Sequence, residues 1–178
     1  MKTALWLTLL ASTGVAFAQP TKDSKPAPPK NDKPMPSAKE LDGLNPWMKT
    51  WSCTATNDAG EKVTAKLTLK RELEKFWRSM KIVVTKTKTK PAFNGMAMFG
   101  NDHIANNWAL HGWDDSGGEI RLKASNAAIS GTAMTWEGEA FGGSAKPVPA
   151  KFTMTIADKK LKFIGEFGGK KSFDYDCK

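Results

Sequence analysis

The sequence is poor in the residue types that build most metal centres. Of its 178 residues, two are histidines, His103 and His111, and two are cysteines. A zinc site needs three or four donors, and a haem group would need a histidine, Tyr175 or a methionine as its axial ligand. We therefore predict no metal ion and no cofactor, and haem is the alternative that the two histidines leave open.

Patterns of nucleophilic catalysis are missing as well, because no Gly-x-Ser-x-Gly motif occurs. Ser116 follows Asp114 closely and His111 precedes both, which is the composition of a hydrolase site. The run Asp-Asp-Ser-Gly-Gly around Ser116 is equally what the backbone of a hairpin turn requires. We predict no catalytic residues, and an enzyme of unknown type is the third functional interpretation.

Long apolar runs are confined to the N-terminus, where Lys2 precedes the apolar stretch that begins at Ala4. Ala16-Phe17-Ala18 matches the small-residue cleavage site of a secretory signal. Residues 1–18 are therefore predicted to be a signal peptide of an exported bacterial protein, either periplasmic or secreted. No later segment reaches the roughly 20 apolar residues of a membrane-spanning helix, so none is expected after signal cleavage.

Residues 19–40 contain many prolines and lysines and almost no aliphatic side chains. Such a segment cannot bury enough apolar surface to offset the entropy lost on ordering. We predict a disordered linker over 19–40, followed by one folded domain over 41–178.

Acidic residues are outnumbered, with 27 lysines and arginines against 18 aspartates and glutamates and a formal charge of +9. Lys62, Lys66 and Lys70 share one face of a single predicted strand. A basic surface favours acidic partners, and for an exported protein an anionic envelope surface is the partner to consider. Export argues against nucleic acid.

Helical periodicity is absent after residue 40, and alternation of apolar and polar residues takes its place. In the stretch 61–70 every odd position except Glu61 is apolar, which is the pattern of a strand with one solvated face. Short turns join about ten such segments, which favours antiparallel neighbours in chain order and a closed up-and-down barrel. A sandwich is the alternative. The predicted strands are 47–53, 61–70, 76–86, 96–99, 107–113, 119–124, 132–140, 148–156, 160–167 and 172–177.

The two cysteines lie in the first and the last predicted strand, Cys53 and Cys177. Export permits a disulfide, and two cysteines allow one intramolecular pairing. In a closed barrel, the first and last strands are the only neighbours that no loop connects, which gives the bond a geometric reason. The alternative is a pair of free thiols. Trp51, two residues before Cys53, is predicted to close the barrel base.

Several short motifs resemble a family of exported bacterial proteins, a domain-of-unknown-function group with a lipocalin-like, calycin-type barrel. They are Trp51-Ser52-Cys53, Phe99-Gly100-Asn101-Asp102 followed by Trp108, Asp114-Asp115-Ser116-Gly117-Gly118, Thr135-Trp136-Glu137-Gly138-Glu139 and Cys177-Lys178. The resemblance covers roughly residues 44–178 and implies a fold without implying a reaction. Lipocalins proper carry Gly-x-Trp on the first strand, and here Lys49 stands at the glycine position.

Tryptophan and methionine are plentiful, with seven and eight residues. Methionine repacks around varied ligands, so these side chains could form an adaptable pocket, although the same residues could simply fill a small barrel. We expect a monomeric, non-enzymatic carrier or sensor for a small apolar ligand. The alternative is a structural or interaction protein with a filled core that contacts the envelope or a protein partner through its basic surface. The candidate ligand-binding residues are Trp77, Met80, Trp108, Trp136, Phe152 and Met154.

Overall fold

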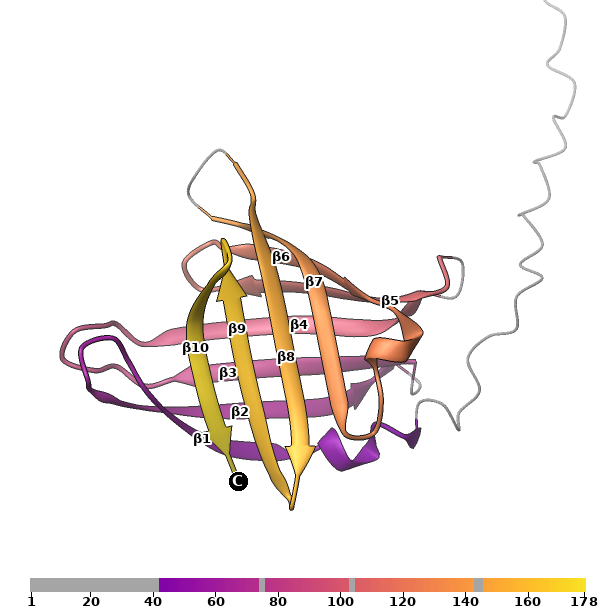
Figure 1. Ribbon diagram of the computed structural model, residues 1–178, viewed down its shortest axis with the longest axis horizontal. Coiled ribbons are helices and arrows are strands. Elements are labelled where there is room, and N and C mark those ends of the chain that lie inside the picture. The colour runs from indigo at the N-terminus through magenta and orange to yellow at the C-terminus, as the bar shows by residue number, and fades with distance from the viewer. Residues whose placement is uncertain (1–41, 74–75, 103–104, 143–145) are drawn as a thin grey trace, which may run out of the picture. The chain divides into compact units, whose positions relative to one another are not determined.

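A computed structural model of the chain describes residues 42–73, 76–102, 105–142 and 146–178 (Figure 1). The predicted signal peptide, the predicted linker and His103 lie outside these residues, as does Leu41, the first residue of the predicted folded domain. Within the described part, no helix is long and apolar enough to cross a membrane.

The described chain forms ten antiparallel strands closed into a barrel. Each strand pairs with the next along the chain, and β10 returns to pair with β1 (Figure 1). The all-β fold class and the up-and-down barrel predicted from alternation are therefore confirmed, and the sandwich is excluded. The strands are β1 (Thr50–Thr56), β2 (Lys62–Glu72), β3 (Trp77–Val84), β4 (Phe93–Asp102), β5 (Asn107–Asp114), β6 (Glu119–Ala124), β7 (Ala133–Phe141), β8 (Val148–Ala157), β9 (Lys160–Phe167) and β10 (Lys170–Cys177).

Strand β2 shows why alternation in the sequence produces this barrel. Its odd positions from Val63 to Leu69 are buried, and its even positions carry lysines and threonines on the outer surface. On that outer surface, neighbouring strands are joined by threonine hydroxyl pairs. The Oγ1 atoms of Thr50 and Thr68 lie 3.0 Å apart, and those of Thr64 and Thr85 lie 2.7 Å apart. Cross-strand threonine pairs of this kind stabilise a sheet modestly.

One cation breaks this pattern. Arg78 points inward from β3, and its side chain is 1% exposed. Its Nη1 donates a hydrogen bond to the carbonyl oxygen of Trp77 at 3.0 Å. Burial lowers the pKa of the Arg78 guanidinium, the charge of Arg71 lowers it further, and Asp42 acts in the opposite direction.

One end of the barrel, here called the closed end, is covered by the 3-10 turn η1 (Asn45–Trp47). Trp47 is completely buried, and the Nε1 of Trp51 donates a hydrogen bond to its carbonyl oxygen at 3.2 Å. Trp51, predicted to close the barrel base, lies beneath this turn and is 1% exposed. The predicted start of the first strand at Trp47 is wrong, because the backbone N–H of Trp47 donates to the carbonyl oxygen of Leu44 within the turn, and β1 begins at Thr50.

The predicted disulfide is present between Cys53 and Cys177, which are also register partners on β1 and β10. The two residues are 124 positions apart in the sequence. The bond therefore fastens the seam, which we define as the junction of β1 and β10 where the sheet closes on itself. The described residues contain no free cysteine.

Candidate ligand-binding site

The interior of the barrel has a filled half and a hollow half. The filled half lies at the closed end, where large side chains from several strands interlock. Phe99 and Trp136 meet there edge to face with ring centroids 5.5 Å apart, and Leu67, Leu122 and Met134 are each at most 1% exposed. This half provides the packing that holds the barrel together.

The hollow half lies at the opposite end, here called the mouth, where the connections β1–β2, β3–β4, β5–β6 and β9–β10 gather. It contains a cavity of about 620 Å³. That volume falls in the range of roughly 300–1,000 Å³ that is usual for small-molecule sites. The cavity is lined mostly by apolar side chains and reaches residues of the hairpin connections such as Pro91 and Ser116.

Part of the cavity is lined by small residues at inward positions of the strands. Ala97 on β4, Gly112 on β5 and Ala140 on β7 all line the cavity. A Cβ atom added at Gly112 would lie 2.9 Å from the Cβ of Ala97 and 3.0 Å from a side-chain carbon of Ile120. Neighbouring side chains therefore leave no room for a larger residue at Gly112, and small residues line this part of the cavity.

The opposite wall is aromatic. Phe152 on β8, Phe163 and Phe167 on β9, and Phe173 on β10 pack against one another. The ring centroids of Phe163 and Phe173 are 4.9 Å apart, and those of Phe152 and Phe163 are 5.5 Å apart, mostly edge to face. Such a cluster offers a large, rigid apolar surface. Tyr175 extends it deeper into the barrel, and burial raises the pKa of its phenol.

The rim of the mouth is held by carboxylates that accept hydrogen bonds across loops. Glu61 accepts from the amide of Asn57 at 2.9 Å and from both the backbone and the hydroxyl of Thr89, which ties the β1–β2 hairpin to the β3–β4 connection. These bonds, those of Thr89 foremost, lower the pKa of Glu61 from 4.5 to about 2. Asp115 accepts from the side-chain amide of Asn94 at 2.8 Å. These hydrogen bonds therefore connect the loops of the rim on the side of the barrel that β1 to β6 form.

Two of the six predicted ligand-binding residues line this cavity. Met80 points into it from β3, and Phe152 belongs to its aromatic wall. Both are 6% exposed. That these two side chains contact a ligand stays a prediction.

The other four lie elsewhere. Trp108, Trp136 and Met154 are buried, and none of them lines the cavity. Trp77 points outward from β3, where it is 37% exposed and covers its register partner Gly100, whose added Cβ would lie 2.9 Å from the indole ring.

Sequence reasoning missed most of the cavity. Phe163, Phe167, Phe173 and Tyr175 occupy inward positions of predicted strands, so the alternation that located the strands could have identified them. Residue type, which favours tryptophan and methionine, does not tell how far an inward residue lies from the closed end. Trp51 marks that end, and the inward residues farthest from it along each strand are the ones that line the hollow half.

The groups considered for metal or acid–base chemistry are engaged in local contacts. His111 lies on the outer face of the barrel, where its Nε2 pairs with Glu119 and its ring lies 4.5 Å from that of Trp113. The hydroxyl of Ser116 donates to Asp114 at 2.6 Å within the β5–β6 turn. Among the described residues, no group of three or more His, Cys, Asp or Glu could hold a metal ion.

The arrangement can therefore enclose an apolar molecule, and in the described residues no nucleophile is paired with a histidine at the cavity. Comparison with protein-family models and with curated proteins finds no match to this chain. The interpretation of its function rests on the cavity and its surroundings.

Proposed function

We propose that the protein is a non-enzymatic carrier or sensor that binds a small apolar molecule inside the barrel. The observation that carries the proposal is the contrast between the two halves of the interior. A barrel whose role was purely structural would gain stability by filling both halves, because protein interiors approach the packing of organic crystals. Here the half of the interior at the mouth keeps a cavity of about 620 Å³, whose lining includes the small side chains of Ala97 and Ala140.

The chemistry of the lining indicates the ligand class. The aromatic wall on β8, β9 and β10 and the aliphatic side chains of β2 and β3 line the same cavity, so a molecule with an extended apolar body would contact rings on one side and aliphatic groups on the other. We expect the aliphatic and aromatic surface of such a ligand to supply most of the binding free energy, at about 25 cal/mol per Å² of apolar area buried.

Export fits this proposal. Disulfides persist in oxidising compartments such as the bacterial periplasm or the extracellular space, and the Cys53–Cys177 bond fastens the fold. Together with the predicted signal peptide, it supports a carrier working outside the cytoplasm. The resemblance to lipocalin-like barrels agrees with the same proposal at the level of fold alone.

The test is binding of N-phenyl-1-naphthylamine, an uncharged probe whose fluorescence rises in apolar surroundings. The wild-type protein should bind it, and Ala140→Phe, which places a ring in the hollow half, should weaken binding by at least tenfold. Ala157→Phe adds the same ring on the outer surface near the closed end and serves as the control. Absence of probe binding by the wild type, together with a clean apo mass in native mass spectrometry of protein from its own host, would refute the carrier.

A second function, contact with an anionic envelope surface, is supported by the outer face of β2. Lys62, Lys66 and Lys70 point outward there, and within the described chain none of them takes part in a salt bridge. By contrast, Lys151 on β8 pairs with Glu137 at 2.8 Å. Sedimentation with vesicles containing phosphatidylglycerol, but not with phosphatidylcholine alone, would support this function. Replacing the three lysines by glutamine should abolish it.

A further inference from the structure

The seam between β1 and β10 is short. Within the described chain the two strands pair at Cys53–Cys177 and at Thr54–Asp176, and toward the closed end the backbone of Ser52 exchanges two hydrogen bonds with that of Lys178. Every other neighbouring pair of strands continues over most of its length. Figure 1 shows β1 and β10 meeting near the C-terminus and diverging toward the mouth. Beyond Thr54 the barrel wall is therefore open on this side.

A β-bulge in β10 accounts for the divergence. Lys171 pairs with Glu166 and Phe173 pairs with Gly165, so Ser172 is an extra residue without a partner on β9. A bulge bends its strand and redirects the side chains next to it. Here it turns the ring of Phe173 inward over Gly165, where an added Cβ would lie 2.1 Å from that ring.

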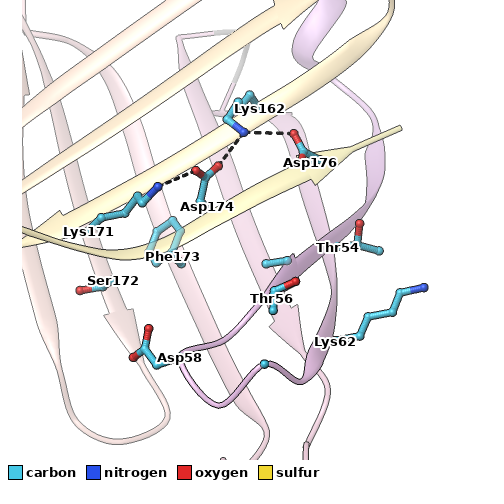
Figure 2. A pocket seen from close by; sticks show the side chains of 12 residues that line it. Thr54, Thr56, Asp58, Lys62, Lys162, Lys171, Ser172, Phe173, Asp174 and Asp176 are labelled. Atoms are coloured by element: carbon cyan, nitrogen blue, oxygen red, sulfur yellow. Dashed lines mark hydrogen bonds and ion pairs between the residues drawn. The ribbon is translucent and has the colours of Figure 1, made fainter.

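A second hollow, here called the slot, occupies the opening. Its volume is about 600 Å³, and it lies between β10 and the β1–β2 hairpin (Figure 2). Ala55, Thr56, Ser172 and Phe173 line both the slot and the apolar cavity. The two hollows therefore meet at these four residues, and Phe173 belongs to the aromatic wall on one side and to the slot on the other.

The slot differs from the cavity in its chemistry. Its lining combines hydroxyl groups with equal numbers of lysines and aspartates, as Figure 2 shows. On the β10 side, the Nζ of Lys162 lies 2.8 Å from Asp174 and 3.2 Å from Asp176, and the Nζ of Lys171 lies 3.0 Å from Asp174. These four charges neutralise one another within the protein.

Two further charged residues lie on the side of the slot that the β1–β2 hairpin forms. Lys62 at the start of β2 and Asp58 in the β1–β2 hairpin line the slot, and neither takes part in a salt bridge or a side-chain hydrogen bond in the described structure. In the same part of the structure, the hydroxyls of Thr54, Thr56 and Ser172 are likewise without a partner among the described residues. Besides the paired charges of β9 and β10, the slot thus presents one cation, one anion and three hydroxyls to a ligand.

Resting on the function proposed above, we propose that the ligand is a single-chain amphiphile with a zwitterionic head, whose apolar chain fills the cavity and whose head occupies the slot. The chain passes the seam beside Phe173. Lys62 meets the anionic group of the head, and Asp58 meets its cationic group. A purely apolar molecule would use the cavity alone and leave the slot to water.

The experiment compares probes that differ only in their heads. Dodecylphosphocholine, lauric acid and dodecylamine, each below its micelle concentration, compete with N-phenyl-1-naphthylamine for the protein. The slot is filled by Thr54→Tyr, because Thr54 is exposed and lines the slot without lining the cavity. Thr155→Tyr, an exposed position on the outer face of β8, is the matched control. Urea unfolding of each variant verifies that the barrel is intact.

We expect Thr54→Tyr to weaken dodecylphosphocholine binding by about tenfold, which corresponds to the loss of a little more than one net hydrogen bond. The affinity for the uncharged probe should not change. Thr155→Tyr should affect neither. Lys62→Gln and Asp58→Asn should each weaken dodecylphosphocholine by up to about fivefold, as expected for exposed charge contacts.

Three results would count against the proposal in distinguishable ways. If Thr54→Tyr leaves dodecylphosphocholine affinity within twofold of wild type, the slot does not hold the head. If lauric acid or dodecylamine binds tenfold more tightly than dodecylphosphocholine, the head is not zwitterionic. If the wild type binds neither the uncharged probe nor any amphiphile, the carrier function itself fails and the slot proposal fails with it.

Discussion

Reducing the Cys53–Cys177 disulfide should remove a large share of the protein's stability. The bond joins residues 124 positions apart, and in the chain-entropy description a loop of that length restricts the unfolded state by about 5 kcal/mol. A typical domain is stable by only about 5–15 kcal/mol. The seam offers little compensation, because β1 and β10 pair over so short a stretch.

The assay is urea unfolding of the oxidised protein and of the same protein kept reduced with a phosphine, followed by tryptophan fluorescence. With a slope of about 2 kcal/mol per molar urea, the midpoint should fall by about 2.5 M on reduction. The Cys53→Ala/Cys177→Ala variant should unfold near the reduced midpoint and should not respond to the phosphine.

A shift of less than about 0.5 M, equal to about 1 kcal/mol at that slope, would refute the reasoning. It would mean that the unfolded chain keeps its ends together without the bond, so that the loop-closure entropy does not apply. Amide hydrogen exchange in β1 and β10 would then be similar in the oxidised and reduced proteins, whereas our reasoning predicts faster exchange in both strands after reduction.

Three further results are expected. The folded-state pKa of Glu61 lies at about 2, below its ordinary value of 4.5, so the stability that Glu61 contributes is present above pH 4.5 and is lost as the pH falls toward 2. The urea midpoint of Glu61→Gln should therefore depend less on pH over this window than that of the wild type. Gly165→Ala should destabilise the barrel by about 1–3 kcal/mol because its methyl group collides with Phe173, and in Phe173→Ala the same change should cost much less by urea unfolding. Tyr175 is the single tyrosine, so absorbance at 295 nm reports its ionisation alone; the midpoint should lie above the usual tyrosine pKa because the ring is buried, and a normal midpoint would show that water reaches it.

The parts of the fold that sequence could predict are those decided by local pattern. Alternation from Val63 to Leu69 is enough to locate β2 and its inward face. The turn at Asp158 and Lys159, where both residues have positive φ, is the two-residue hairpin expected between two alternating segments. By contrast, β4 begins at Phe93 rather than at Met96. Residue Asn94 is held there by Asp115, and that contact is invisible in the local sequence.

The candidate site was harder to predict because it depends on position along the barrel axis. Phe152 and Met154 both point inward from β8, yet only Phe152, which lies farther from the closed end, reaches the cavity. The slot depends on the bulge at Ser172, and a bulge appears only when the register on both sides is known. Arg78 was overlooked because alternation alone does not anticipate a cation at an inward position.

The topology also determines the order in which the strands can meet as the chain folds. Every neighbouring pair except the seam joins consecutive strands, whereas β1 and β10 must meet across most of the domain. Distant contacts require a larger loop to close and so form late. We expect a curled, still open sheet to precede the barrel, with β1 and β10 as its two exposed edges. Two molecules that met at this stage could complete each other's barrels by exchanging an edge strand. Cys53 of one chain would then bond to Cys177 of the other, giving a covalent, domain-swapped dimer.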